Sequence, residues 1–233
     1  MPGRREKTVP ISVVTIEREY GSGGAAIAEI LAKRLGWALW DRNLTSEILK
    51  MSDTLPGATS GRRASEQHDP LLYRLAKVFA RGSYERTLPL RAGETHDAER
   101  IVQLLTRVIE RVGAGEKAVI VGRGGAYILR NHPTAFHVFV FAPYEEKLRR
   151  VIASGKSEAE AAELLETVDQ ERGAFVKRYT GRDWPNRYLY NLWINSIIGD
   201  DAVVQTMLSA ISMIEERGIR SKPSDPTSAP EIR

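Results

Sequence analysis

The sequence predicts an α/β fold in which helices flank a parallel β-sheet. Short apolar runs such as residues 11–16 (ISVVTI) and 118–121 (AVIV) are typical of strands buried on both faces of a parallel sheet. Segments with apolar residues every three or four positions, typical of amphipathic helices, alternate with these runs. Glycine-rich turns follow two of the runs, at residues 17–24 and 122–125. This alternation favours a parallel sheet with crossover helices.

Each element follows from the period of its apolar residues. In order, the sequence predicts strand 11–16, helix 25–35, strand 37–40, helices 43–51, 70–79 and 98–112, strands 118–121 and 137–141, helices 144–153 and 157–176, strand 192–194 and helix 200–217. Gly36 is a candidate stop for the first helix, because glycine commonly follows a helix end. Asp200 is a candidate cap for the last helix.

The length of 233 residues fits one domain with embellishments. The predicted domain spans residues 11–217. A basic tail at 1–10 precedes it, and a tail at 218–233, rich in Pro and Ser, is expected to be disordered. Residues 52–97 contain loop-forming stretches and are expected to form an insert. Residues 154–187 form a second distinct segment, basic toward its end.

The composition excludes several classes of function. The chain has no Cys, which excludes a disulfide scaffold, a thiolate metal centre and a cysteine nucleophile. The four His residues are scattered, which disfavours a histidine metal cage. No apolar run reaches 18 residues and the N-terminus lacks a signal-peptide pattern, so we expect a soluble cytoplasmic protein. The formal net charge of +4 fits a protein that binds small anions.

The glycine-rich turn after the first strand is the strongest functional signal. Between a buried strand and a helix, such a turn presents backbone N–H groups and a positive helix end, which bind phosphate. Gly21, Gly23 and Ala26 satisfy G-x-G-x-x-A, and Asp41 follows about twenty residues later, as in dinucleotide-binding folds. Four polar residues, 17–20, separate the predicted strand from the first glycine, however. A turn without a ligand is the structural alternative.

A P-loop, with the general pattern G-x-x-x-x-G-K-[ST], fits the long turn better. With Gly23 as its last glycine, Arg18 takes the first glycine position, Gly24 the Lys position and Ala25 the Ser/Thr position. The chain therefore lacks the Lys that reaches the β- and γ-phosphates and the hydroxyl that usually binds Mg²⁺. Arg18 is placed to restore the positive charge from the other side of the loop.

The residues around this turn resemble the cytidylate kinase-like family of P-loop nucleoside monophosphate kinases. The family's loop R-E-x-G-S-G-G, its L-G pair and its aromatic-D-R strand end all occur in TIEREYGSGGAAIAEILAKRLGWALWDRNLTSEI, residues 15–48. The matching residues are Arg18, Glu19, Gly21, Ser22, Gly23, Gly24, Asp41 and Arg42. The similarity continues in VIVGRGGAYIL, HVFVFAPYEEKLRRV and YTGRDWPNRYLYNLWIN, and so covers most of residues 11–214. Family members often carry a basic residue where this chain has Ala25.

The resemblance implies a three-layer P-loop kinase fold in which the insert at about 52–97 binds the acceptor and the segment at about 154–187 is a basic lid. It implies transfer of the γ-phosphoryl group of ATP, with Mg²⁺, to a nucleoside monophosphate such as CMP. The expected partners are nucleotides, with no nucleic acid and no membrane.

The resemblance also assigns expected roles, and phosphoryl transfer suits arginines because it depends on positioning and charge neutralisation. Expected to bind ATP are Gly21, Ser22, Gly23, Gly24, Arg149 and Arg150. Expected to bind the acceptor are Asp41, Arg42 and Arg123. Expected to be catalytic are Arg18, Arg123, Arg172 and Arg178. No protein metal ligand is expected. Asp169 and Arg172, three residues apart, form either a lid pair or a surface pair on a helix.

Two other functions remain open from the sequence. A sensor or regulatory protein that binds a nucleotide without turnover would explain the missing Lys and Ser/Thr at Gly24 and Ala25. An oxidoreductase would require a tightly bound nicotinamide cofactor. A helix that begins at Gly23, with the loop around an anion, favours the P-loop over the dinucleotide fold.

Overall fold

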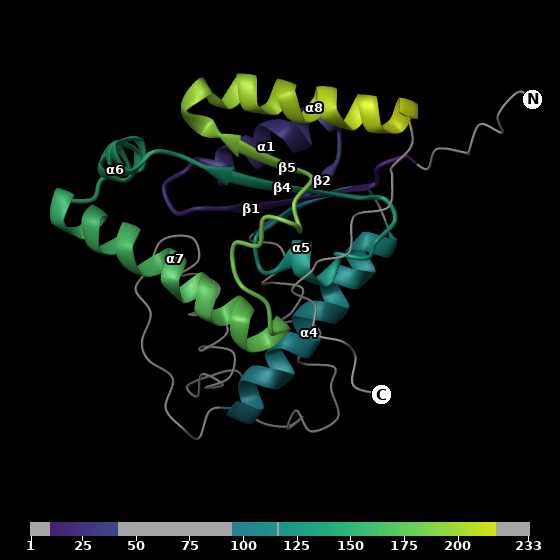
Figure 1. Cartoon of the computed structure of the whole chain (residues 1–233), viewed down its shortest axis with the longest axis horizontal. Helices are drawn as coiled ribbons and strands as arrows, with labels where there is room; N and C mark the ends of the chain where they lie inside the picture. Colours follow the sequence, from purple (N-terminus) through teal and green to yellow (C-terminus); the bar gives the residue numbers. More distant parts are fainter. Residues whose placement is uncertain (1–9, 42–94, 116, 218–233) are drawn as a thin grey trace, which may run out of the picture.

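The structure of the chain is a computed structural model that describes residues 10–41, 95–115 and 117–217 (Figure 1). Arg42, the predicted helices at 43–51 and 70–79, almost all of the predicted insert and most of both tails lie outside the described residues.

Five parallel strands form one sheet in the order β2-β3-β1-β4-β5. The strands are β1 (Val13–Arg18), β2 (Ala38–Trp40), β3 (Ala118–Val121), β4 (Ala135–Phe141) and β5 (Leu192–Asn195). The central strand β1 pairs with β3 on one side and with β4 on the other. Its first five residues are buried, because helices cover both faces of the sheet.

Two layers of helices cover the sheet (Figure 1). The helices are α1 (Gly24–Leu35), α4 (Thr95–Ala114), α5 (Gly125–Ile128), α6 (Tyr144–Ala153), α7 (Glu158–Thr180) and α8 (Asp200–Arg217), with the short 3₁₀ helix η1 (Ser196–Ile198) after β5. Helices α1 and α8 pack on the face to which Val14 and Ile16 point. Helices α4, α5 and α7 lie on the opposite face, where α4 packs against Val13.

The prediction of alternating strands and helices is confirmed wherever the chain is described, and most bounds agree within a few residues. Gly36 ends α1 in a left-handed conformation, as predicted. Three details were wrong. The short helix α5 was not predicted. The first strand continues through Arg18, so only Glu19 and Tyr20 separate it from Gly21. Asp200 lies in the first turn of α8 and does not precede it.

The strand order decides between the two phosphate-binding folds that the turn allowed. In the dinucleotide-binding fold the second strand lies beside the first, whereas here β3 lies between β1 and β2. The gap before Gly21, which seemed to argue against that fold, is only two residues long and carries less weight. The chain leaving β1 crosses to one side of the sheet and the chain leaving β3 crosses to the other. Ligands of open α/β sheets bind at such a switch point, outside the carboxyl ends of the strands.

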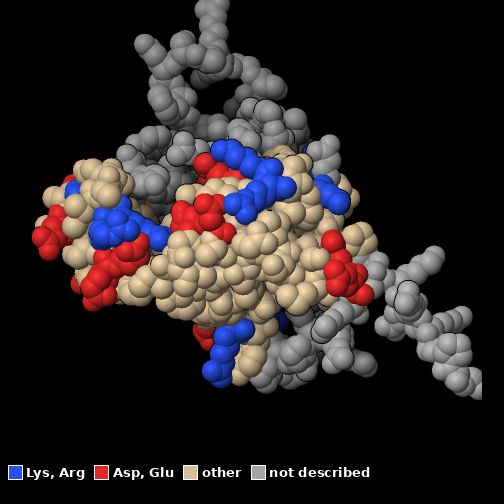
Figure 2. All heavy atoms as spheres, turned by 90° about the horizontal axis from the view of Figure 1, so that it is seen from above, with Lys and Arg blue, Asp and Glu red and all other residues tan. Residues whose placement is uncertain are grey.

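The outer face over α8 is mostly uncharged, and the Lys and Arg side chains seen there lie next to Asp and Glu side chains (Figure 2). They form no continuous basic stripe on that face. Within the described part of the chain, none of the helices combines the length and the apolar character needed to cross a membrane.

Candidate functional site

The loop between β1 and α1 is a cradle of backbone amides at the carboxyl edge of the sheet. Gly21 and Gly23 take left-handed conformations, with φ of 76° and 81°, which glycine adopts without steric cost. Helix α1 begins at Gly24, one residue before the predicted start at Ala25, and Gly23 precedes its first turn. Its first N–H groups have no partner within the helix and carry the positive end of the helix dipole. The loop therefore has the form of an anion-binding site.

Arg18 connects this loop to the turn that follows β3. A Cβ added to Gly24 would lie 2.7 Å from Cβ and 2.8 Å from Cγ of Arg18. At the other end of the side chain, a Cβ added to Gly122 would collide with Nη1 of Arg18. The stem of Arg18 thus passes Gly24, and its guanidinium group lies against Gly122. The sequence placed Arg18 at the loop, and the structure shows that its charge reaches the neighbouring strand end.

Arg123 occupies the turn after β3 in a strained backbone conformation. Its φ is 59°, between Gly122 at 64° and Gly124 at 68°, and a left-handed conformation is uncommon for a residue with a side chain. Burial lowers the pKa of Arg123 to about 10, with contributions in the same direction from the charges of Arg18 and Arg172. Asp41, at the carboxyl end of β2, acts against this shift. Arg123 remains protonated at neutral pH and lies within the field of two other arginines.

Arg172 reaches the same edge from α7, through a pair with Asp169. Arg172 Nη1 donates to Asp169 Oδ1 at 2.8 Å and to the carbonyl oxygen of Arg18 at 2.9 Å. Both oxygens of Asp169 accept from the N–H of Tyr20 at 3.0 Å. The two side chains are only 15% and 20% exposed. The pair is therefore not a surface pair: it fixes α7 to the backbone that leads into the glycine loop.

Burial dominates the electrostatics of this pair as well. It lowers the pKa of Arg172 to about 10, helped by the charge of Arg18 and opposed by Asp169 and Glu17. It raises the pKa of Asp169, although Arg172 and the Tyr20 N–H act in the opposite direction. Arg18, Arg123 and Arg172, which we call the arginine cluster, thus concentrate positive charge beside the loop. Such a cluster becomes favourable when an anion with several negative oxygens binds.

Glu17 is the site residue that the sequence reasoning missed, because it was placed in a polar turn. It lies in β1 with 3% of its surface exposed. Burial raises the pKa of its carboxyl group, against the opposing charges of Arg18 and Arg172. Glu17 shares its face of the strand with Val13 and Thr15, so continuing the alternation by one step past Ile16 would have indicated a buried acid.

The other expected site residues do not all face the glycine loop. Ser22 is buried, and its Oγ donates to the carbonyl oxygen of Glu19 at 2.8 Å within the loop. On α6, Arg149 is exposed and pairs with Glu146, whereas Arg150 turns toward the loop. Arg178 lies within α7, but its side chain is outside the described part of the structure. All of Arg42 is outside it as well.

The cradle and the arginine cluster fit the phosphates of ATP, since amides and guanidinium groups both bind phosphate oxygens. Among the described residues, no three His, Cys, Asp or Glu side chains gather into a metal site. Mg²⁺ does not require one, because it usually binds through one or two carboxylates, water and substrate phosphates. The residues are thus compatible with Mg²⁺ that is bound mainly through ATP.

Comparison with known proteins agrees with this geometry. Residues 13–197 match the model of the cytidylate kinase-like family. No curated protein matches the chain. Among solved structures, an uncharacterized protein from Eubacterium ventriosum aligns with a TM-score of 0.60 at 21% identity, over 86% of this chain and 98% of that one. This similarity shows the fold.

Shikimate kinase from Bacteroides thetaiotaomicron aligns at 14% identity, over 86% of this chain and 98% of that one. Its TM-score of 0.47 is too low to support an inference. The three-layer α/β P-loop kinase fold expected from the sequence is confirmed, and family and fold together support a kinase-like phosphotransferase. The family match runs from β1 to η1 and includes both glycine turns, and the chain belongs to the cytidylate kinase-like family.

Proposed function

We propose that the protein transfers the γ-phosphoryl group of ATP to a nucleoside monophosphate, with CMP as the model acceptor. The observation that carries the proposal is the arginine cluster of Arg18, Arg123 and Arg172 beside an amide cradle, at the carboxyl ends of β1 and β3. Phosphoryl transfer needs positioned phosphates and stabilisation of charge on the transferring oxygens, and these groups supply both.

The donor phosphates would bind the loop amides from Gly21 to Gly24. Gly24 stands where most P-loops have Lys, so the cation must come from elsewhere. The guanidinium group of Arg18, held against Gly122, lies between the donor loop and the turn after β3 and is suited to this role. Mg²⁺ bound with ATP would neutralise further negative charge on the phosphates.

The acceptor would bind across the carboxyl ends of β2 and β3. Arg123 offers a guanidinium fork for the acceptor monophosphate, and its strained backbone supports a functional role. Asp41 lies near enough for its charge to act on Arg123, so it can orient that side chain or bind the acceptor sugar. Arg42, next in the chain, completes the proposed acceptor group.

The transition state would draw on arginines from the segment after β4. Arg172 already lies in the cluster, and Arg178 is proposed to join it from the end of α7. Arg149, whose side chain is 68% exposed, would have to leave Glu146 to reach a donor phosphate. These groups would stabilise the charge spread over the transferring phosphoryl group.

The test is a coupled assay for ADP formation with ATP, Mg²⁺ and each nucleoside monophosphate in turn. We expect turnover that depends on the acceptor and is highest with CMP or a close analogue. The variant Arg123→Met should raise the KM of the acceptor and lower kcat, while Arg34→Met, on the remote surface of α1, should match the wild type. Nucleotide binding without turnover on any acceptor would contradict the proposal.

A nucleotide-binding regulatory protein without turnover is the second candidate. Gly24 and Ala25, in place of Lys and Ser/Thr, favour it, since both missing groups normally act on the β- and γ-phosphates and on Mg²⁺. A thermal-shift screen of nucleotides with and without Mg²⁺ separates binding from catalysis, because a bound ligand stabilises the fold by mass action. A clear shift together with zero turnover supports this second function.

A further inference from the structure

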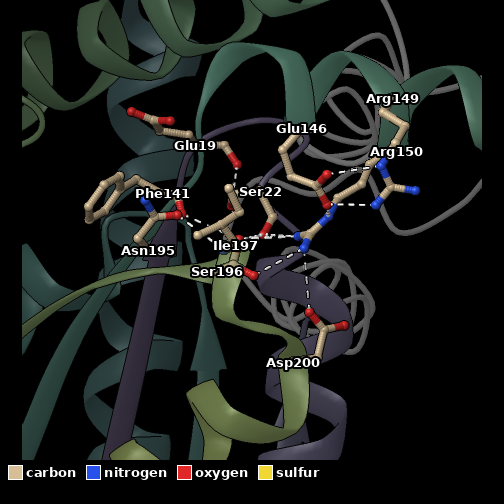
Figure 3. A network of polar contacts seen from close by, with 10 residues as sticks. All are labelled: Glu19, Ser22, Phe141, Glu146, Arg149, Arg150, Asn195, Ser196, Ile197 and Asp200. Atoms are coloured by element: carbon tan, nitrogen blue, oxygen red, sulfur yellow. Dashed lines mark hydrogen bonds and ion pairs between the residues drawn. The ribbon is translucent and has the colours of Figure 1, made fainter.

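The outer side of the glycine loop is held by one arginine of α6. Arg150 Nη1 donates to the carbonyl oxygen of Ser22 at 2.6 Å and to Ser196 Oγ at 3.2 Å (Figure 3). Its Nη2 donates to the carbonyl oxygen of Ser196 at 3.2 Å, and its Nε donates to Glu146 at 2.6 Å. Asp200 lies 3.8 Å from Nη2. The guanidinium group thus contacts the loop, η1 and the start of α8 at once.

The carbonyl group of Ser22 is the centre of this network. It accepts one hydrogen bond from Arg150 and a second, at 2.6 Å, from Ser196 Oγ. A carbonyl oxygen has two lone pairs, so both acceptor positions are occupied. Because a trans peptide points its C=O and its N–H in opposite directions, this arrangement aims the N–H of Gly23 away from α6. No described residue accepts a hydrogen bond from that N–H.

We propose that Arg150 is a positioning residue that shapes the glycine loop for phosphate before any ligand binds, and that it does not itself contact the donor phosphates. This inference rests on the proposed phosphate-binding role of the loop. It assigns Arg150 a role different from the direct ATP contact expected from the sequence. The loop lacks the usual Lys, so its affinity depends on correctly oriented amides, and Arg150 orients the peptide between Ser22 and Gly23.

The surroundings of Arg150 support this role in two further ways. A Cβ added to Gly23 would collide with Nη1 of Arg150, so the guanidinium group is packed directly against the loop backbone. Its charge is also compensated locally. Glu146 accepts hydrogen bonds from Arg149 and Arg150, which together lower the pKa of its carboxyl group to about 2. A cation with its donors engaged and its charge paired suits a structural contact better than a phosphate contact.

The first arm of the experiment measures backbone hydrogen exchange in the ligand-free protein. We compare the wild type with Arg150→Gln, Arg150→Lys and Ser196→Ala. Exchange in the segment 19–26 should become at least tenfold faster in Arg150→Gln, while β1 and β4 exchange as before. The control Arg34→Gln removes another arginine tie between helices, the 2.6 Å ion pair to Asp201, and should leave the segment unchanged.

The second arm measures binding of inorganic pyrophosphate and tripolyphosphate by calorimetry. Misaligned amides should weaken both ligands by a similar factor, about tenfold. Ser196→Ala should act in the same direction. Because both side chains act on one carbonyl group, the double variant should lose less than the product of the two single losses. Arg150→Lys should recover little, since an ammonium group cannot reproduce the guanidinium fork.

The two arms separate the possible results. Faster exchange with weaker binding of both polyphosphates supports the proposal. Normal exchange in Arg150→Gln overturns it: weaker binding would then make Arg150 a direct phosphate ligand, and normal binding would leave it without a role at the loop. If the wild type binds neither polyphosphate, the proposed function is in doubt, and the exchange arm still decides whether Arg150 orders the loop.

Discussion

The two glycine-rich turns lie at the ends of neighbouring strands, yet they present different groups to the same edge of the sheet. The loop after β1, at Gly21–Gly24, presents backbone amides at the start of a helix of 12 residues. The turn after β3, at Gly122–Gly125, presents the side chain of Arg123 and leads into a helix of only four residues. In the proposed function, the first turn would bind the phosphate chain of ATP and the second would bind the single phosphate of the acceptor.

The contacts that hold the two turns in place also differ. Helix α6, helix α7 and η1 hold the backbone of the first turn through Arg150, Asp169 and Ser196. The second turn is packed against the guanidinium group of Arg18, which ends β1 shortly before the first turn and whose stem passes Gly24. An amide cradle binds through backbone N–H groups, so its whole backbone must be held in place. A guanidinium group lies at the end of a side chain, so only the backbone of its own residue must be held. Arg18 therefore makes the second turn depend on the first, and four changes can test this relation.

The largest effect is expected from removing the charge of the second turn. Arg123→Met should lower kcat/KM for the acceptor about a thousandfold, or about 4 kcal/mol, as for loss of one preorganised charge-stabilising group. The free energy of unfolding should stay the same or rise, because burial and two neighbouring arginines disfavour this charge. Steady-state kinetics and urea unfolding on the same samples check both parts. A large loss of stability would mean that Arg123 is mainly structural.

A second change loosens the support of the first turn. Asp169→Asn removes the carboxylate that binds Tyr20 and Arg172, and breaking such a largely buried pair should cost about 3 kcal/mol. The matched control is Asp183→Asn, which breaks the exposed pair with Lys177 and should cost less than about 1 kcal/mol. Urea midpoints measure both. Equal losses would show that Asp169 is no more than a surface partner.

A third change tests the contact between the turns. Gly122→Ala forces Ala to a φ of 64° and also displaces Arg18, whereas Gly124→Ala, at 68°, meets no neighbouring atom. Both should lose about 1 kcal/mol from backbone strain, and Gly122→Ala should lose more. In the background Arg18→Ala, the difference between the two should disappear. If it persists in urea unfolding, Arg18 does not bridge the turns.

The smallest effect concerns the buried acid beneath both turns. Burial raises the pKa of Glu17 in the folded state above its ordinary value of 4.5. Its contribution to stability is therefore greatest at low pH and is lost as the pH rises through the folded-state pKa. Relative to Glu17→Gln, the wild type should lose stability between pH 4.5 and 8, measured by urea unfolding at each pH. The exposed Glu29→Gln serves as control, and equal pH dependence of all three proteins would refute the effect.

Much of the fold was predictable because local patterns carry it. Buried parallel strands are short apolar runs, so residues 118–121 were identified with correct bounds. The helix at 200–217 was also predicted correctly from its spacing. The short helix α5 was missed, because four residues are too few to show a period. The end of β1 was placed too early, since Glu17 and Arg18 are polar although Glu17 is buried.

Part of the candidate site could likewise be predicted from the sequence, and part could not. The R-E-x-G-S-G-G loop and the G-R-G-G turn were visible in the sequence, because a backbone that must turn sharply at a strand end requires glycine. Which arginines meet there was not. Arg149 and Arg150 are adjacent and both share Glu146, yet only Arg150 reaches the loop. One step along a helix rotates a side chain by about 100°, so packing alone decides which neighbour points inward.

By itself, the sequence determined the parallel α/β fold and the two glycine turns, because period and residue type are local properties. It also led to the proposal of phosphate chemistry carried by arginines and amides. Only the tertiary structure decided that β3 separates β1 from β2. It also decided that Arg18 spans two turns and that α7 binds the backbone at Tyr20. These contacts join residues more than a hundred positions apart, and burial and long-range packing, not local propensity, set their geometry.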